Sequence, residues 1–477
     1  MITGTYWSIL DDVSIRKIEE TAIRLLVKSG ARIEHEDLLS MLEESGCSID
    51  RAALRAYFSE DLVRNVMSRI GEKNPKPVRI PVGWNPQWHM AHVGSQPHIL
   101  DWPSCERRLA TRQDVTNMAK MAHVLDEFTL VGKVLTCNEI DQRIEPLWAV
   151  LQIARITNKK IVGGEIFFPG YIEPLIHMGE VLTGKTWDHS LISECDFFTQ
   201  PLIFERKQAE CFIEKRKWKI PNIPGSMVIA GVSGPVTLAG STALGLAELL
   251  AGWVLGYLID PDLPVGGIIA SGSLDMRTMN TVFASPEALL INVTTTNMVK
   301  RLYGIEIIPI NSYTDCKVPG INATFQKMYG LLCAPFSKIH SIGTDGLLSA
   351  GQDYSPIQHI LDNEMNKAIE RFWGHFEVND DTLAIEELEE VIKNNTTFLI
   401  QRHTLKHFKD EHWFPRWLDR SAWRGSEIEA ETERDMLYRI DHYCQEAIRR
   451  YEQPEIDKLK IHELERIYIN AEKKLLV

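Results

Sequence analysis

The chain has 477 residues and a formal net charge of -13, so it exceeds the usual size of one domain and lacks the excess of Lys and Arg that a nucleic-acid partner requires. With 44% hydrophobic and 25% charged residues, its composition is that of an ordinary soluble globular protein. No two of its eight cysteines form a CxxC pair, which predicts reduced thiols in a cytoplasmic protein and argues against a disulfide framework or a zinc site.

Two features bear on a membrane location. The N-terminus has no basic segment followed by an apolar one, so we expect no signal peptide. The most apolar stretch, 236–259, approaches the length of a bilayer span. It carries Glu248 and many small residues and lies between two predicted strands, so we expect a buried helix and no membrane contact.

Residues 1–77 are expected to form a helical N-terminal segment. Apolar residues recur there at the spacing of amphipathic helices, and two prolines end the pattern. The predicted helices are 14–30, 36–46 and 60–70.

From 78 to about 375 the sequence alternates between short apolar runs and helical patterns, after a hairpin predicted over 78–93. The predicted strands are 98–101, 128–132, 161–165, 197–204, 227–231, 265–271, 306–310 and 338–340. The predicted helices are 111–125, 145–157, 172–183, 206–219, 236–258, 286–303, 322–334 and 356–372. About eight β/α units predict a (β/α)8 TIM barrel over 78–375. A doubly wound open sheet is the alternative, but it usually carries GxGxxG after its first strand, and the sequence has no such motif there.

The stretch 227–272 shows this organisation most clearly. A short apolar run, a long apolar helix and a second apolar run follow one another, so the two strands should be parallel neighbours. Polar and small residues follow each strand: Ser233 and Gly234 after the first, Ser271 and Gly272 after the second. In a parallel barrel the carboxyl ends of the strands are where active sites lie.

Residues 376–477 are expected to form a helical C-terminal extension. The sequence there is polar, is rich in charge pairs four residues apart, and places Trp413, Trp417 and Trp423 among charges. The predicted helices are 427–451 and 456–474. We expect this extension to pack on the barrel or on another subunit, which makes a homo-oligomer the expected assembly.

Four stretches together, in their order and spacing, resemble the trimethylamine methyltransferase family. They read Val-Ser-Gly-Pro-Val-Thr-Leu-Ala-Gly (232–240), Tyr-Thr-Asp-Cys-Lys-Val-Pro (313–319), Asp-Asn-Glu (362–364) and His-Thr-Leu-Lys-His-Phe (403–408). The resemblance covers about 14–454. It implies a TIM barrel that presents a methylated amine to the cobalt of a corrinoid (cobalamin) carried by a separate partner protein. The founding members carry pyrrolysine, whereas this chain holds only the twenty standard residues. It therefore resembles the branch whose members demethylate quaternary amines such as glycine betaine.

Demethylation of a quaternary amine makes specific demands on a site. Attack on a methyl carbon expels a neutral tertiary amine, so no general acid is required at the nitrogen. The site must instead hold the cation, aim one methyl group and exclude water. The absence of GxSxG, HExxH and Walker A motifs agrees with this chemistry.

Aromatic and acidic residues near predicted strand ends are the candidates for holding the cation, since a cation–π contact contributes up to ~2 kcal/mol in a dry site. The aromatic candidates are Trp102, Phe167, Phe204, Tyr313 and Tyr354. Core packing is the alternative role for each. Glu165 is expected to balance the positive charge, or else to satisfy a loop.

Polar residues complete the predicted site. Asp315 would supply negative charge, or else stabilise a turn or cap the following helix. His340 and Asn311 would bind the polar end of the substrate, although His340 could be a core histidine. Ser233 and Gly234 would allow close approach of the corrinoid, or else form a strand-to-helix turn.

His403 and His407 lie four residues apart and so share one side of a helix. Such a pair can bind zinc, but no third ligand is evident nearby, so we expect packing of the extension near the mouth of the barrel or at the interface with the corrinoid protein, and no metal site.

The predicted function is a cytoplasmic methyltransferase acting on a betaine-like substrate and a partner corrinoid protein. Its rivals are a corrinoid methyltransferase for a tertiary amine or a methoxyl compound, and a betaine-binding protein without catalysis.

Overall fold

The computed structural model describes residues 9–73, 91–92, 94–333, 346–374, 376–422 and 432–476. Its centre is a series of parallel strands in which each strand pairs with the next one along the chain. The strands are β4 (Ala91–His92), β7 (Leu130–Gly132), β8 (Lys160–Val162), β9 (Cys195–Phe197), β11 (Ile223–Ser226), β13 (Gly267–Ile269) and β16 (Ile307–Pro309). A parallel bridge between Gly164 and Ile192 connects β8 to β9. The protein is therefore a mixed α/β fold with a parallel core.

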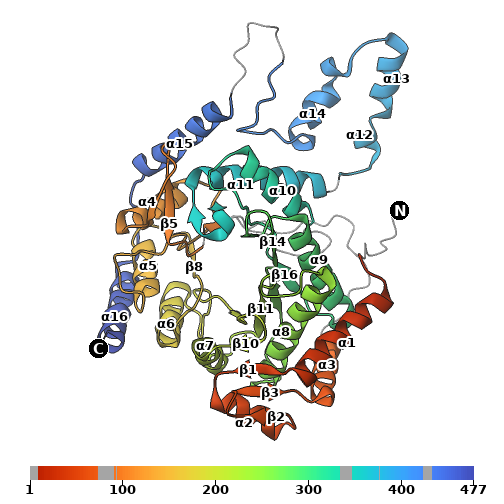
Figure 1. The fold of residues 1–477 in the computed structure, drawn as a ribbon. Helices are drawn as coiled ribbons and strands as arrows, with labels where there is room; N and C mark the ends of the chain where they lie inside the picture. The colour runs from red at the N-terminus through yellow and green to blue at the C-terminus, as the bar shows by residue number, and fades with distance from the viewer. Residues whose placement is uncertain are drawn as a thin grey trace.

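A helix separates each of these strands from the next. The helices are α4 (Arg112–Val124), α5 (Glu145–Ala154), α6 (Ile172–Thr183), α7 (Arg206–Lys217), α8 (Leu238–Ile259), α9 (Pro286–Tyr303) and α10 (Ile321–Leu332), and α11 (Pro356–Trp373) ends the series. Figure 1 shows them succeeding one another around the strands, from α4 in orange to α11 in cyan. The pairing that would close the strands into a ring is not among those of the described residues, and the strand predicted at 338–340 lies outside them.

Two predicted strands differ from those observed in the parallel series. Residues 98–101 form β5 (His98–Asp101), but this strand pairs with β6 (Glu106–Leu109) in a hairpin and with β18 (Asp353–Tyr354), outside the series. The predicted strand 227–231 contains only the two-residue β12 (Ile229–Ala230), which pairs outside the parallel series, and the strand of the series lies earlier, in β11. Pro224 cannot donate to a ladder and Gly225 has a low strand propensity, so the apolar pattern pointed to the run that follows.

Helix α8 lies at the centre of the packing, as predicted. It is the one helix among the described residues that is long and apolar enough to span a bilayer, and most of it is buried inside the protein. Its Trp253 is fully buried, and the indole N–H donates to the carbonyl oxygen of Gly266 at 2.7 Å. The hydrophobicity of α8 therefore serves contacts within the protein.

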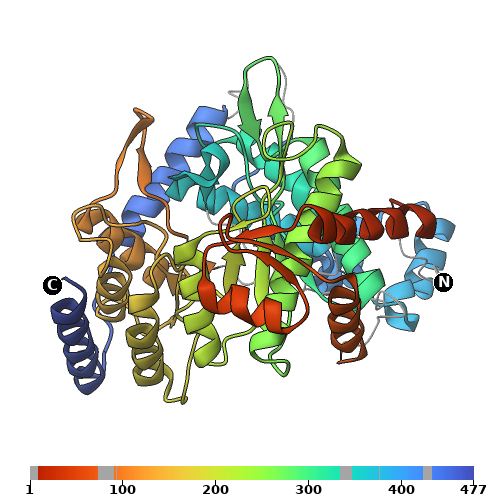
Figure 2. The ribbon, with the colours of Figure 1, turned by 60° about the horizontal axis from the view of Figure 1, so that its bottom comes forward.

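The N-terminal segment contains the predicted helices and a small sheet that was not predicted. The helices are α1 (Asp12–Lys28), α2 (Glu36–Glu44) and α3 (Glu60–Lys73). The strands are β1 (Ala31–Ile33), β2 (Ser48–Asp50) and β3 (Arg55–Tyr57), and β1 also pairs with β10 (Ile203–Phe204). Three-residue strands are too short to show a period of two, which is why the segment was predicted as helical alone. Helix α1 packs along α8, and Figure 2 shows the segment, in red, lying against the body.

The C-terminal extension has two parts. Helices α15 (Glu433–Arg449) and α16 (Lys458–Leu475) return to the body and pack on α4 and α11 and on α5 and α6. Helices α12 (Asp380–Leu383), α13 (Ile385–Asn394) and α14 (Arg402–Glu411) stand apart from the body in Figure 1. Glu364 on α11 holds the segment after α14 to the body, because its carboxylate accepts hydrogen bonds from the N–H groups of Arg416 and Trp417 at 2.6 and 3.1 Å.

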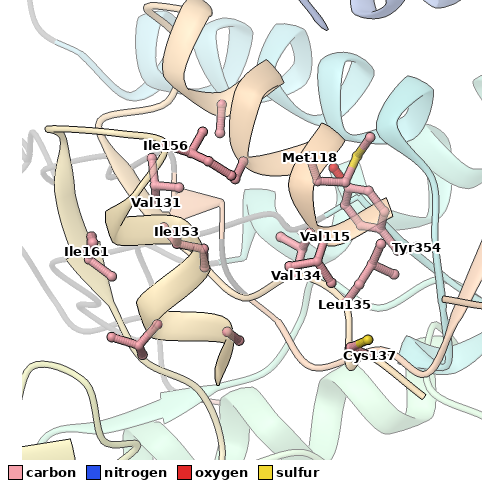
Figure 3. Packing of buried hydrophobic residues seen from close by; sticks show 14 of the residues in the cluster. Val115, Met118, Val131, Val134, Leu135, Cys137, Ile153, Ile156, Ile161 and Tyr354 are labelled. Carbon is pink, nitrogen blue, oxygen red and sulfur yellow. The ribbon is translucent and has the colours of Figure 1, made fainter. Parts of the chain in front are cut away.

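Two hydrophobic clusters form the core. One lies around β7 and helices α4 to α6 and extends to α11, α15 and α16. Figure 3 shows part of it, including Val134, Leu135 and Tyr354. The other joins the N-terminal segment to α8 and α9. Both ends of the chain are therefore built into the core of the protein.

Candidate active site

Glu165 follows β8 after two glycines. The first of them, Gly163, has no room for a side chain, because a Cβ there would lie 1.6 Å from the carbonyl oxygen of Leu191. The Glu165 side chain is exposed, yet burial by the surrounding protein raises the pKa of its carboxyl above the ordinary value, and Lys133 and Lys215 oppose that rise. Surrounding protein desolvates such a carboxylate and penalises its charge even where water still reaches it. A cation that binds beside Glu165 would stabilise its ionised form.

Lys133 and Glu145 form a buried ion pair next to this carboxylate. Lys133 follows β7, and its Nζ lies 2.6 Å from Oε2 of Glu145, with side chains 10% and 1% exposed. The other Glu145 oxygen accepts the backbone N–H of Cys137 at 2.9 Å. A Cβ on Gly164 would lie 3.9 Å from Cε of Lys133, so the lysine flanks the residue before Glu165. Sequence reasoning missed the pair, although a lysine directly after a strand and a glutamate opening the next helix are its signal.

The segment after β4 connects Glu165 to Tyr313. Ser95 Oγ would lie 2.9 Å from a Cβ on Gly164, so this segment borders the Glu165 loop. The Gln96 side-chain amide donates to the carbonyl oxygen of Gly351 at 3.3 Å. Gly351 has a φ of +84°, and a Cβ on it would lie 3.0 Å from the ring of Tyr313. The structure thus places Glu165 and Tyr313 at the same end of the parallel strands, joined by a short series of contacts.

Asp315 has a structural role in the described contacts. Its two carboxylate oxygens accept the backbone N–H groups of Phe283 and Ala284 at 2.9 and 3.0 Å, which fixes the segment that leads into α9. The ring of Phe283 meets that of Tyr313 edge to face at 5.4 Å. The predicted roles of Asp315 were to supply charge in the site, to stabilise its own turn or to cap the following helix. The described contacts show that it stabilises a different loop, the one before α9. Phe283 is an aromatic candidate that the sequence did not indicate.

Asn311 lies just after β16, and its buried side-chain amide has one nitrogen without a hydrogen-bond partner among the described residues. Its Oδ1 accepts from the Nδ2 of Asn292 at 3.2 Å, and Asn292 Oδ1 accepts the N–H of Ser271 at 2.8 Å. The Asn311 Nδ2 and the Ser271 Oγ are both buried and have no hydrogen-bond partner among the described residues. Two unpartnered donors after adjacent strands could hold a substrate carboxylate, because an unpaired buried donor is costly until an acceptor arrives.

Of two further predicted aromatics, Phe167 is exposed and Trp102 is half-buried against the core. Phe167 is 64% exposed on the loop after Glu165, and its N–H donates to the hydroxyl of Tyr171 at 2.6 Å. Trp102 lies in the turn between β5 and β6 and meets the ring of Tyr438 on α15 at 5.5 Å. Phe167 remains near the candidate site, whereas the described contact of Trp102 is with the C-terminal extension.

Phe204 and Tyr354 are core residues. This corrects their prediction as residues that hold the cation, and agrees with the alternative role of core packing. Phe204 is 1% exposed and packs between Phe198 and Phe212, with ring centroids 4.7 and 5.3 Å away. Tyr354 is fully buried in the cluster of Figure 3, and its hydroxyl lies 3.3 Å from Nδ1 of His359. Each is the last residue of a strand, β10 or β18 (Asp353–Tyr354), that pairs outside the parallel series. The predicted residue His340 lies outside the described residues.

Ser233 and Gly234 form a turn after the short strand β12 (Ile229–Ala230). The Ser233 hydroxyl accepts the N–H of Ile229 at 2.9 Å, and a Cβ on Gly234 would lie 2.4 Å from Val228. These contacts show the strand-to-helix turn. What the turn presents outward is apolar, since Val232 is 60% exposed.

His403 and His407 pack on each other with ring centroids 4.3 Å apart, on α14. His403 Nε2 lies 2.9 Å from the Asp381 carbonyl oxygen, and His407 Nε2 lies 3.2 Å from its carboxylate. Within the described parts of the chain no group of three or more His, Cys, Asp or Glu side chains is arranged to hold a metal ion. The pair fastens α14 to α12.

Comparison with known proteins identifies the family of the chain. A family described as trimethylamine methyltransferase (MTTB) matches residues 3–476. The chain is 25% identical to a glycine betaine methyltransferase from Desulfitobacterium hafniense over 427 residues, which are 87% of this chain and 88% of the relative. It is also 25% identical to a trimethylamine methyltransferase, MttB, from the same species over 417 residues, covering 84% and 82% of the two chains.

Among solved structures, the chain is similar to the monomethylamine methyltransferase MtmB of Methanosarcina barkeri. That structure is 11% identical in sequence, with a TM-score of 0.45, over 98% of this chain and 94% of the other. The family match over almost the whole length decides the assignment: the chain belongs to the trimethylamine methyltransferase family.

Proposed function

We propose that this protein transfers a methyl group from a quaternary amine of the betaine type to the Co(I) corrinoid of a partner protein, in the cytoplasm. Family membership supports methyl transfer from a methylated amine. The similarity to a glycine betaine methyltransferase supports the quaternary amine. The proposal includes the closed (β/α)8 barrel predicted from the sequence, which the chain-order succession of parallel strands among the described residues supports.

The observation that carries the proposal is the environment of Glu165. An accessible carboxylate whose charge is penalised by burial favours a cationic ligand at its side. Tyr313 and Phe283 offer aromatic faces at the same end of the strands, and the exposed Phe167 lies two residues away along the loop. Carboxylate and aromatic rings together are the groups that bind a quaternary ammonium.

The reaction asks little acid–base chemistry of these residues. The methyl carbon takes an electron pair from Co(I), the methyl carbon–nitrogen bond breaks, and its electron pair stays on nitrogen. The leaving amine is neutral, so no proton moves. The corrinoid is the methyl acceptor and a substrate of this chain. Glu165 and the rings bind and orient the ammonium, and the enclosing protein keeps water from the methyl group.

A betaine also carries a carboxylate, and Asn311 with Ser271 supports its recognition. Their buried Nδ2 and Oγ lack partners among the described residues and sit after adjacent parallel strands. A carboxylate oxygen would satisfy both donors. This pair would distinguish a betaine from a methylated amine without an acid group.

The corrinoid partner would meet the rim at the carboxyl ends of the strands. Strand β12 pairs with β14 (Gly272–Asp275), so the turn after β12 lies beside the hairpin of β14 and β15 (Asn280–Val282). Their exposed apolar residues are Val232, Val236, Met276 and Met279. An exposed apolar surface beside the candidate site is suited to bind a partner protein that delivers its cofactor to that site.

Trimethylamine is the alternative donor, because a relative of equal identity is a trimethylamine methyltransferase. Trimethylamine is attacked productively only when its nitrogen is protonated. Its turnover would therefore fall as pH passes the pKa of the amine, whereas a quaternary donor carries no titrating proton. Measuring methyl transfer to Co(I) corrinoid between pH 6 and 11 with each donor separates the two. We expect activity with glycine betaine and no alkaline loss linked to the donor; exclusive turnover of trimethylamine would overturn the proposal.

A further inference from the structure

Residues 379–411, which we call the arm, comprise α12, α13, the turn 398–400 and α14. The arm leaves the body after α11 and stands apart from it in Figure 1. Of its side chains only Val391 is buried. Helices this short are marginal in water unless an apolar face is covered by other structure.

The arm nevertheless exposes an extensive apolar surface. Eight of its large apolar side chains are between 37% and 77% exposed: Leu383, Ile385, Leu388, Ile392, Phe398, Leu399, Ile400 and Leu405. On α13 the spacing of Ile385, Leu388 and Ile392 aligns them along one side of the helix. A monomer rarely leaves such a surface open to water, so it marks an interface.

The internal contacts of the arm fix its shape without covering this surface. Asp381 at the start of α12 accepts the Lys406 ammonium at 2.6 Å and faces His407 at 3.2 Å. The Thr404 hydroxyl donates to the carbonyl oxygen of Phe398 at 2.6 Å. These polar contacts hold α14 against α12 and leave the apolar stripe of α13 facing outward.

The charges of the arm are divided between its two longer helices. Helix α13 carries Glu386, Glu387, Glu389 and Glu390 against one lysine, while α14 carries Arg402, Lys406 and Lys409 against two acidic residues. The arm is therefore complementary to itself in charge as well as in its apolar character. A two-fold axis can place α13 of one copy on α14 of the other and repeat that contact reciprocally.

The area agrees with a pair of arms. If each of the eight side chains loses about 60 Å² to a partner, roughly 500 Å² of apolar surface is buried per copy. A standard interface buries about 800 Å² per partner, of which somewhat more than half is apolar. The arm alone thus supplies the apolar part of a stable dimer interface.

We propose that two copies of this chain associate through their arms, with the acidic α13 of each lying on the basic α14 of the other. The barrel and its candidate site stay outside this contact, so association leaves the site of each copy accessible. The inference is independent of the proposed substrate.

The test is the mass of the full-length protein in solution, measured by light scattering over a range of concentrations. The wild type should have twice the 54.4 kDa of one chain. The double variant Ile392→Glu/Leu399→Glu should be a monomer with an unchanged circular dichroism spectrum. Leu459→Glu, at an 81% exposed position on α16, is the matched control and should remain dimeric.

A charge exchange makes the test specific for the pairing of α13 with α14. Glu386→Lys/Glu390→Lys and Arg402→Glu/Lys409→Glu should each weaken self-association at least tenfold. Mixed together, the two variants should form a heterodimer. One variant then has two basic helices and the other two acidic helices, so both α13–α14 contacts of the mixed pair join opposite charges. A monomeric wild type, a dimer that survives Ile392→Glu/Leu399→Glu, or the absence of a heterodimer in the mixture would each overturn the proposal. A wild type that stays monomeric because its arm binds only the corrinoid protein would overturn the proposal in the same way.

Discussion

At the scale of single residues, the site depends on how protein and charge act on Glu165. Burial raises the pKa of its carboxyl, and the positive charges of Lys133 and Lys215 counteract that effect. The ionised form is the one that attracts an ammonium, so the site works above this pKa. The carboxylate also lies near the half-buried Cys195 on β9, and desolvation raises the pKa of that thiol well above its usual value.

Glu165→Gln should raise the apparent KM for the quaternary amine about 10-fold or more, equivalent to ~1.4 kcal/mol of binding free energy. The wild-type rate should increase with pH as Glu165 ionises, and the variant should lose this acidic limb. Steady-state kinetics from pH 5 to 8 measure both effects. Glu173→Gln on the outer face of α6 is the control; equal kinetics for the wild type and Glu165→Gln would remove Glu165 from the site.

Lys133→Met should destabilise the protein by about 3–5 kcal/mol, because it leaves the buried charge of Glu145 without its partner. The double variant Lys133→Met/Glu145→Gln should recover part of this loss. In both variants the acidic limb of the pH–rate profile should move to higher pH, since Glu165 has lost a stabilising cation. Denaturant unfolding and kinetics test the two parts, and Lys474→Met, whose surface pair with Glu173 spans 3.4 Å, should change neither.

The sequence indicated Glu165 because it follows a glycine pair at the end of an apolar run. It failed for Phe204 and Tyr354 because composition cannot tell which strands join the parallel series. Phe204→Ala should therefore lower stability by about 3–5 kcal/mol and leave the KM for the amine unchanged. Phe167→Ala should do the reverse, with a higher KM and an unchanged melting temperature. An increased KM for Phe204→Ala without loss of stability would return that residue to the cage.

At the scale of elements, α8 combines an apolar surface with one buried acid. Burial raises the pKa of Glu248 to about 7, although the Ser226 hydroxyl, the Leu202 N–H and the Gln200 amide donate to it. These bonds tie the segment after β9 to β11 and α8. The Glu248 carboxyl therefore stabilises the packing of α8 on the strands that it covers.

Because the folded-state pKa lies above the unfolded value of 4.5, the folded protein holds this proton more tightly than the unfolded chain. The stabilisation, roughly 3 kcal/mol in full, is present below pH 4.5 and is lost as pH rises to about 7. Glu248→Gln should remove this slope. The free energy of unfolding of the wild type relative to the variant, measured from pH 4.5 to 8, should fall across that window; parallel curves would contradict the assignment.

The helices of the body were predicted well because most of them carry long amphipathic patterns and some have clear caps. Thr111 opens α4 with a capping box, and Ser285 and Ser355 cap α9 and α11 just before a proline. Short strands were predicted less well. The three-residue strands β1 to β3 carry too little pattern, and Pro224 and Gly225 disguise β11.

At the scale of the whole molecule, both terminal segments contribute to the core. Helices α1 and α3 pack on α8, and α15 and α16 close over α4 to α6. The boundaries predicted at 77 and 375 therefore remain a proposal about sequence units, since packing crosses both. The sequence anticipated that the extension makes contacts, but the division between a docked pair of helices and a projecting arm depends on tertiary packing that no local pattern encodes.

The central claim is that this chain moves a methyl group from a quaternary amine to a corrinoid. The most direct measurement mixes the purified protein with Co(I) corrinoid and glycine betaine, then follows the loss of Co(I) absorbance together with the tertiary amine formed. We expect one equivalent of dimethylglycine for each methylated corrinoid, and strongly reduced conversion by Glu165→Gln. Binding of glycine betaine and related quaternary amines without any methylation of the corrinoid would contradict it.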